Sequence, residues 1–163
     1  MDDVFQLAAP EDVESVFHLY EQRIDWMNEK NIHQWNNTDY LDVYPVAYYR
    51  KQQEEGSLYV LKRGAVVVGA AVLLEADDRW ADAPAISAYY IHNLVTSPTH
   101  PGAGRQMLHE MVCLTRRAGK QALRLDCSVD NDFLNTYYES FGFLMAGRCQ
   151  DGPYSGNRRE KRL

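Results

Sequence analysis

"HPGAGRQML", residues 100–108, places two glycines between an apolar run and a segment with helical spacing of its apolar residues. Glycine permits a positive φ and lets an anion approach the backbone without a Cβ in the way. The first amides of a helix lack intrahelical acceptors and lie at the positive end of its dipole. The stretch therefore predicts either a phosphate-binding loop or a ligand-free turn from strand to helix, and these residues alone leave both open.

The flanking residues predict a strand–helix–strand unit around this stretch. "AISAYYIHNLVT" before it is a long β-prone run, and "ALRLDCSV" after it is another strand. Between them, apolar residues recur at helical spacing from Met107, and Gly119 stands where a helix C-terminus is expected. The crossover from Ile91 to Asp126 then joins two parallel strands.

The pattern of apolar and turn-forming residues predicts both helices and strands in the rest of the chain. We expect helices from Pro10, over 46–54 and over 131–141, and a loop over 29–40. We expect strands at 4–8, on either side of Arg63–Gly64, at 142–148 and at 157–163. The order predicts an α+β (mixed α/β) fold, a mostly antiparallel sheet covered by about four helices, in a single domain spanning residues 1–163.

Composition excludes several classes of protein. A net charge of −6 over 163 residues disfavours a nucleic-acid partner. The longest apolar run, Ala65–Leu74, is too short to span a membrane, and the acidic start lacks the basic region of a signal peptide. Three cysteines without metal-ligand spacing are consistent with reduced thiols, no metal and a cytoplasmic location.

Known phosphate motifs narrow the possibilities for the glycine pair. A nucleotide P-loop needs four residues between its glycines and a following Gly-Lys-Ser/Thr, which this stretch lacks. A dinucleotide fingerprint needs a third glycine where Met107 stands, which argues against a nucleotide-binding α/β domain. The remaining form is the cradle that holds the pyrophosphate of coenzyme A.

Three segments together resemble the GNAT superfamily of acyl-CoA-dependent N-acyltransferases. They are "YYIHNLVTSPTHPGAGRQML", "LRLDCSVDN" and "LNTYYESFGF", and the likeness covers residues 89–147. The resemblance implies a sheet whose middle strand splays from its neighbour, with acetyl-CoA as co-substrate in the gap. It also implies an amine acceptor, either a small molecule or a peptide, and a possible homodimer.

Carried over by position, the resemblance implies a set of co-substrate contacts. The strand backbone at the end of the third long β run would meet pantetheine, the glycine loop would hold the pyrophosphate, and the next helix would begin with a contact to the pantetheine arm. These residues are Leu94, Val95 and Thr96; Pro101, Gly102, Ala103, Gly104, Arg105 and Gln106; Asn131 and Tyr138.

The chain departs from the family pattern at two places. The loop is shorter than usual, and neither Thr99 nor Pro101 supplies its customary Arg or Gln. The strand glutamate that is frequent in the family corresponds to Tyr90, which cannot act as a base near neutral pH. We assign Tyr90 to substrate binding. These departures leave a non-catalytic acyl-CoA-binding or sensing domain as the alternative function.

The chemistry of acyl transfer to an amine requires a base and an acid. An amine attacks only when neutral, and His92, two residues after Tyr90 on the same strand, is the candidate base. "IHNL" resembles the aralkylamine N-acetyltransferase branch, in which a histidine at this place serves deprotonation. Tyr138, in "YYESFGF", is the expected proton donor to the leaving thiolate. Trp35, in an aromatic-rich region, is the expected acceptor-binding residue.

Overall fold

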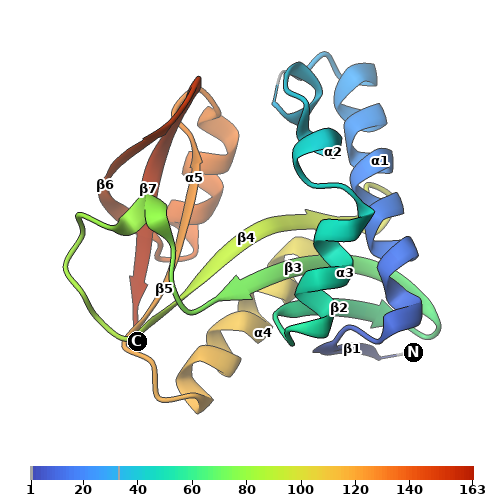
Figure 1. Cartoon of the computed structure of the whole chain (residues 1–163), viewed down its shortest axis with the longest axis horizontal. Coiled ribbons are helices and arrows are strands. Elements are labelled where there is room, and N and C mark those ends of the chain that lie inside the picture. Colours follow the sequence, from blue (N-terminus) through green and yellow to red (C-terminus); the bar gives the residue numbers. More distant parts are fainter. Residues whose placement is uncertain (1, 33) are drawn as a thin grey trace. The chain divides into compact units, whose positions relative to one another are not determined.

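The computed structural model describes residues 2–32 and 34–163, which fold into a mixed α/β structure (Figure 1). The strands form one seven-stranded sheet in the order β1-β2-β3-β4-β5-β7-β6. The strands are β1 (Asp3–Leu7), β2 (Leu58–Arg63), β3 (Val66–Leu74), β4 (Ala88–Thr96), β5 (Ala122–Ser128), β6 (Leu144–Asp151) and β7 (Tyr154–Arg162). The helices are α1 (Val13–Glu29), α2 (Tyr40–Val43), α3 (Val46–Glu54), α4 (Ala103–Arg117) and α5 (Asp132–Ser140).

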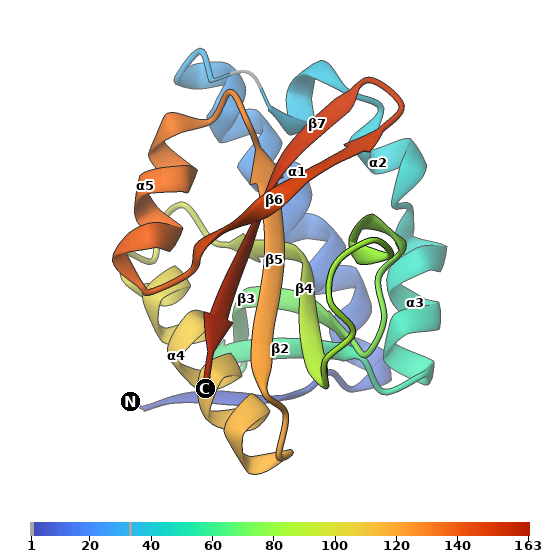
Figure 2. The ribbon, with the colours of Figure 1, turned by 90° about the vertical axis from the view of Figure 1, so that its left-hand side faces the viewer.

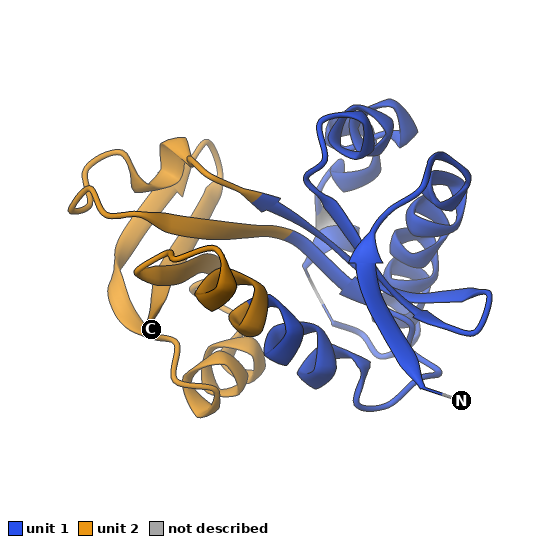
Figure 3. Ribbon diagram, turned by 90° about the horizontal axis from the view of Figure 1, so that it is seen from below, with its two compact units in different colours: residues 1–73, 93–111 blue, residues 74–92, 112–163 orange. Residues whose placement is uncertain are grey.

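The chain divides into two compact units, coloured separately in Figure 3. The first contains residues 1–73 and 93–111, and the second contains residues 74–92 and 112–163. Strand β4 and helix α4 each contribute residues to both units, because the boundaries fall within them.

In the first unit, β1, β2 and β3 form an antiparallel ladder, and α1 packs against α3. The apolar face of α1 and the inward-facing residues of β2 lie in the core of this unit, where Val13, Val16 and Leu58 are completely buried. Helix α4 approaches β3 closely at Gly69, where an added Cβ would lie 3.2 Å from Met107 Cγ. Glycine permits this close approach, because a side chain at residue 69 would push the methionine aside by a few tenths of an ångström.

In the second unit, β5 pairs with β7 and β7 with β6, all antiparallel (Figure 2). Strand β4 pairs with β5 in parallel through Ala88–Tyr90 and Ala122–Arg124, which confirms the predicted crossover. Within this unit the described ladder between the two strands ends there, although β4 runs on to His92 and β5 to Ser128. Helix α5 packs on β5, β6 and β7.

The structure corrects several predicted bounds. Pro10 opens a 3₁₀ turn over Pro10–Asp12, and the α-helix begins at Val13. The segment predicted as a loop over 29–40 contains a 3₁₀ turn at Trp35–Asn37, and the one-turn helix α2 begins at its last residue; residue 33 lies outside the described residues. The described residues form five α-helices, in line with the expectation of about four; the one-turn α2 was not predicted, because its aromatic segment has no periodicity to reveal it.

Candidate active site

The loop between β4 and α4 is held by a cluster of small polar side chains. Ser97 Oγ lies 3.0 Å from Thr99 Oγ1 and 3.0 Å from His100 Nδ1, and Thr99 Oγ1 lies 3.2 Å from the same nitrogen. The Thr99 amide also donates to Ser97 Oγ at 3.4 Å. Side-chain hydrogen bonds of this kind stabilise tight turns. They give the shortened loop a fixed shape without the usual Arg or Gln.

Helix α4 begins directly after this loop, so the predicted glycine motif is split between turn and helix. Gly102 has φ +88 in the turn, and Ala103 starts the helix. The Gln106 amide donates to Gly102 O at 3.1 Å, closing the first helical turn. The amides of Gly104 and Arg105 have no hydrogen-bond acceptor among residues 2–32 and 34–163. Two unpaired amides thus lie at the positive end of a fifteen-residue helix.

The last residues of β4 are tied to both neighbouring elements of the first unit. Val95 is buried, and the Ser97 amide donates to Val68 O of β3 at 2.8 Å. Arg23 of α1 donates through Nη2 to the Thr96 carbonyl oxygen at 2.6 Å and to Thr96 Oγ1 at 3.1 Å. The Thr96 carbonyl, which we expected to be available to a ligand, already has a charged donor.

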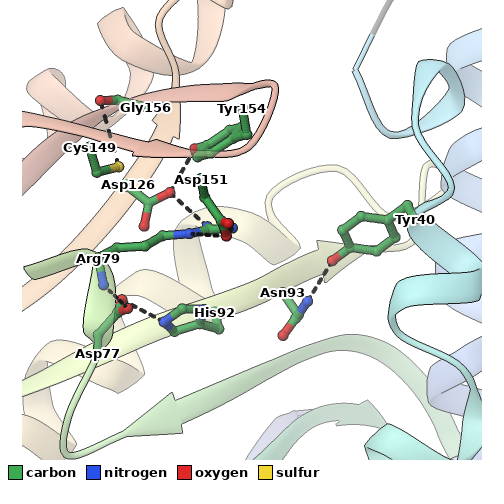
Figure 4. Close-up of polar contacts among 10 residues, drawn as sticks. All are labelled: Tyr40, Asp77, Arg79, His92, Asn93, Asp126, Cys149, Asp151, Tyr154 and Gly156. Atoms are coloured by element: carbon green, nitrogen blue, oxygen red, sulfur yellow. Dashed lines mark hydrogen bonds and ion pairs between the residues drawn. The ribbon is translucent and has the colours of Figure 1, made fainter.

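Asn93 is a functional candidate that the sequence analysis missed. Its φ of +55, within β4, is the left-handed conformation that Asn tolerates better than most residues. Its Nδ2 donates to the Tyr40 hydroxyl at 2.7 Å, as Figure 4 shows. The Tyr48 hydroxyl donates to its Oδ1 at 2.9 Å, and the Tyr20 hydroxyl donates to its carbonyl oxygen. An asparagine inside a β-prone run was the signal available in the sequence.

The aromatic region around Trp35 forms a continuous stack in the first unit. Trp35 stacks on Tyr40 with ring centroids 4.5 Å apart and planes at 14°, and Tyr20 contacts both rings. Tyr20 also stacks on the fully buried Tyr49. Burial raises the pKa of the Tyr20, Tyr40 and Tyr49 hydroxyls, so all three remain protonated. One face of Trp35 is therefore occupied by protein, and its role in acceptor binding stays a prediction.

In the second unit, His92 is paired with a carboxylate that was not predicted. Its Nε2 lies 2.7 Å from Asp77 Oδ2, and the two side chains are 15% and 6% exposed (Figure 4). The other oxygen of Asp77 accepts the Arg79 amide at 2.9 Å, capping the 3₁₀ turn Asp78–Trp80. Burial acts to raise the pKa of Asp77, but the interactions with His92, the Arg79 amide and the Arg79 charge together outweigh it and lower that pKa below the usual 3.8.

Arg79 connects the same loop to two strands of the second unit. Its Nη1 lies 3.1 Å from Asp126 Oδ1 on β5, and its Nη2 lies 2.9 Å from Asp151 Oδ2 on β6. The Tyr154 hydroxyl donates to Asp126 at 2.6 Å, and the guanidinium lies 4.6 Å from the centre of the Tyr154 ring. The charges in this cluster, drawn in Figure 4, are therefore paired.

Tyr90 lies in a packed cluster of the second unit. It is 8% exposed and packs edge-on against Trp80. Its hydroxyl accepts from Arg124 Nη1 at 2.9 Å, and Arg124, itself 2% exposed, pairs with Glu160 at 2.7 Å. The tyrosine that replaces the usual glutamate thus solvates a buried guanidinium, and its substrate-binding role stays a prediction.

Tyr138 lies in α5 of the second unit, and Asn131 is the N-cap of this helix. Asn131 caps the helix by accepting the Leu134 amide at 2.9 Å. Tyr138 is 8% exposed and packs against Phe143, and its hydroxyl has no hydrogen-bond partner among the described residues. Burial raises the pKa of Tyr138, and the nearby Cys127 adds to that shift. The phenol is therefore protonated at neutral pH and has an unused donor.

The sequence model of the acetyltransferase (GNAT) family matches residues 18–143. The chain belongs to this family. The uncharacterised N-acetyltransferase YesJ of Bacillus subtilis is 26% identical over 155 residues, which cover 89% of this chain and 83% of YesJ. A GNAT acetyltransferase from Listeria monocytogenes has a similar structure, with a TM-score of 0.82 and 24% identity over 99% of this chain and 95% of that one. PaiA N-acetyltransferase from Thermoplasma acidophilum, solved with coenzyme A, has a TM-score of 0.77 and 16% identity over the whole of both chains.

Membership confirms the predicted family, fold class and enzyme type: this GNAT protein is an N-acetyltransferase. None of the described helices is long and apolar enough to cross a membrane. The roles assigned to individual residues remain predictions, and they are developed next.

Proposed function

We propose that the protein transfers the acetyl group of acetyl-CoA to a primary amine by direct attack within a ternary complex. The observation that carries this proposal is the start of α4, where the unpaired amides of Gly104 and Arg105 follow a left-handed Gly102. Such a backbone arrangement suits a pyrophosphate, whose charge the helix dipole also favours. The coenzyme A complex of PaiA, on the same fold, supports this assignment.

Backbone groups of Leu94 and Val95 would bind the pantetheine arm and polarise the thioester carbonyl. Leu94 and Val95 directly follow Asn93, which has a left-handed backbone and whose carbonyl and side chain are held by three tyrosines. A donor fixed in this way stabilises a developing oxyanion without reorganising. Asn131, fixed at the start of α5, would contact the same arm.

Two side chains of the second unit would move the protons. His92 takes a proton from the incoming ammonium or from the amine as it attacks the thioester carbon. The tetrahedral intermediate then collapses, the carbon–sulfur bond breaks, and Tyr138 donates its hydroxyl proton to the leaving thiolate. Tyr138 suits this role because its buried phenol is protonated and its hydroxyl is otherwise unbonded.

The acceptor is a small-molecule or peptide amine, and Trp35 with its aromatic neighbours is the proposed surface for its apolar or cationic part.

We also propose that residues 1–163 act as a single domain. Strand β4 and helix α4 run through both compact units, so neither unit contains a complete copy of these elements. Three cysteines that form no disulfide are consistent with a cytoplasmic location.

The experiment that tests the function measures thiol release from acetyl-CoA against a panel of amines. We expect Tyr138→Phe to lower kcat by about 10²-fold or more while KM for acetyl-CoA stays unchanged. The adjacent Tyr137→Phe removes a hydroxyl from the same helix and should retain wild-type turnover. If the protein bound acetyl-CoA but released no thiol with any amine, the result would contradict an enzymatic function and favour an acyl-CoA-sensing domain. An unchanged rate for Tyr138→Phe would remove its assigned role.

A further inference from the structure

The segment between β3 and β4, residues 75–87, is anchored to the second unit along its length. We refer to it as the Asp77 loop. Trp80 is 4% exposed, and the guanidinium groups of Arg124 and Arg158 lie 4.6 Å and 5.6 Å from its ring centre. Arg124 also donates through Nη2 to the Pro84 carbonyl at 3.0 Å, and Arg158 pairs with Asp82. With Arg79 bound to strands β5 and β6, the loop holds a fixed position in this unit.

This anchoring fixes Asp77 through both of its oxygens. Oδ1 accepts the Arg79 amide at 2.9 Å and Oδ2 faces His92 Nε2 at 2.7 Å. The groups facing this pair are therefore the backbone of the 3₁₀ turn and, more remotely, the Arg79 guanidinium, which is neutralised by Asp126 and Asp151. A carboxylate held in this way cannot rotate to offer His92 a different partner.

An ionised carboxylate accepts hydrogen bonds and donates none. The pKa of Asp77 lies below 3.8, so the group is ionised at neutral pH and His92 Nε2 must carry the proton that they share. Nδ1 then holds the imidazole lone pair, and it has no partner among the described residues. The ring is prepared to accept a proton at one defined atom.

We propose that Asp77 is a positioning residue, which holds His92 in the Nε2–H tautomer so that Nδ1 is the atom that accepts the proton of the amine. This role rests on the proposed function of His92 as the base. A carboxylate that orients a catalytic imidazole acts by the same logic in hydrolase triads. Here it comes from a loop whose sequence, "ADDRWADAP", carries no motif.

The substitution Asp77→Asn tests the proposal because the turn decides how the new amide is oriented. Asn is as good an N-cap as Asp, so its oxygen remains on the Arg79 amide. Its NH₂ group then points at His92 Nε2 as a donor and forces the opposite tautomer. We expect kcat to fall by about 10²- to 10⁴-fold, the range for losing a general base or its tautomer. KM for acetyl-CoA should be unchanged.

The neighbouring Asp78→Asn is the matched control. It removes the same charge from the same turn, but the Asp78 side chain is exposed and no hydrogen bond or ion pair joins it to His92. It should retain wild-type kcat. Equal losses in the two variants would overturn the proposal, because they would trace the effect to loop charge and not to His92.

The tautomer is read directly from the ¹⁵N chemical shifts of the His92 ring nitrogens, which a merely structural role would not reverse. We expect Nε2 protonated in the wild-type protein and Nδ1 protonated in Asp77→Asn. A wild-type ring protonated on Nδ1, or an unchanged tautomer in the variant, would overturn the proposal. Failure of the proposed function looks different: the tautomer would reverse in Asp77→Asn while His92→Ala kept full activity.

Discussion

Asn93 offers the sharpest test of how the strand beside the site is held. Its backbone is left-handed within β4, and its side chain is bound at both ends by tyrosines of α2 and α3. Replacing it therefore has two separable consequences: the loss of side-chain hydrogen bonds and a change in backbone strain. Gly and Ala separate them, because both remove the bonds but only Ala resists a positive φ.

The magnitudes follow from these contacts. The two side-chain bonds, of 2.7 Å and 2.9 Å, contribute about 1 kcal/mol each. Asn93→Gly should therefore lower the free energy of unfolding by about 2 kcal/mol. Asn93→Ala should lower it by about 3 kcal/mol, since the left-handed conformation costs a residue with a Cβ about 1 kcal/mol more than glycine. Asn93→Asp retains a side chain that both tyrosine hydroxyls can reach and should lose least.

The assay is urea unfolding followed by fluorescence, with the free energies extrapolated linearly to water. Equal m-values among the three variants would show that the comparison concerns stability and not the extent of unfolding. An Ala variant as stable as the Gly variant, or more stable, would refute the assignment of backbone strain at this residue. A Gly variant with wild-type stability would refute the contribution of the two tyrosine hydroxyls.

Three further perturbations have clear expectations. Burial raises the pKa of Cys127 to about 11, whereas Cys113 is half-buried, so a thiol reagent at pH 8 should modify Cys113 in the native protein and Cys127 only after unfolding. Gly102→Ala meets no atom within 4 Å, so its cost should be the backbone term alone, about 1–2 kcal/mol by urea unfolding, with a raised KM for acetyl-CoA. The pKa of Asp77 is lowered below 3.8 in the folded protein, so its interaction with His92 stabilises the fold above that pH. In an acid titration this stability should be lost as the pH falls from 3.8 through the pKa of folded Asp77. Asp77→Asn should flatten the dependence of the free energy of unfolding on pH in this range.

The sequence predicted helices and strands correctly where the apolar residues follow one regular spacing. The helix over 46–54 begins and ends as expected, and Gly119 and Gly142 have the positive φ of helix C-termini, +71 and +86. The segment 29–40, which precedes that helix, was predicted as a loop because its aromatic residues and asparagines follow neither the helical nor the strand spacing. Its turns are fixed by rings that stack in three dimensions, which no local pattern encodes.

The same distinction separates the site residues that could be predicted from those that could not. Tyr138 and the glycine loop lie within contiguous motifs, which is why the sequence alone could propose them as site residues. Asp77 was missed because its partner is 15 residues away, beyond a loop of unremarkable composition. The surroundings of Tyr90 could not be predicted because the sequence does not reveal that the buried Arg124 of β5 faces its hydroxyl. Pairing between distant segments decides these roles.

The contact between Arg23 and the Thr96 carbonyl has an evolutionary consequence. A carbonyl oxygen is the same in every residue, so substitutions at position 96 leave this acceptor in place, and the hydroxyl contributes only the secondary contact at 3.1 Å. Arg23 has no such freedom, because a lysine cannot supply the two guanidinium nitrogens that reach this oxygen. Among relatives that share the contact, sequence drift should therefore be concentrated on the strand and not on the helix, although the strand is the element proposed to meet the co-substrate.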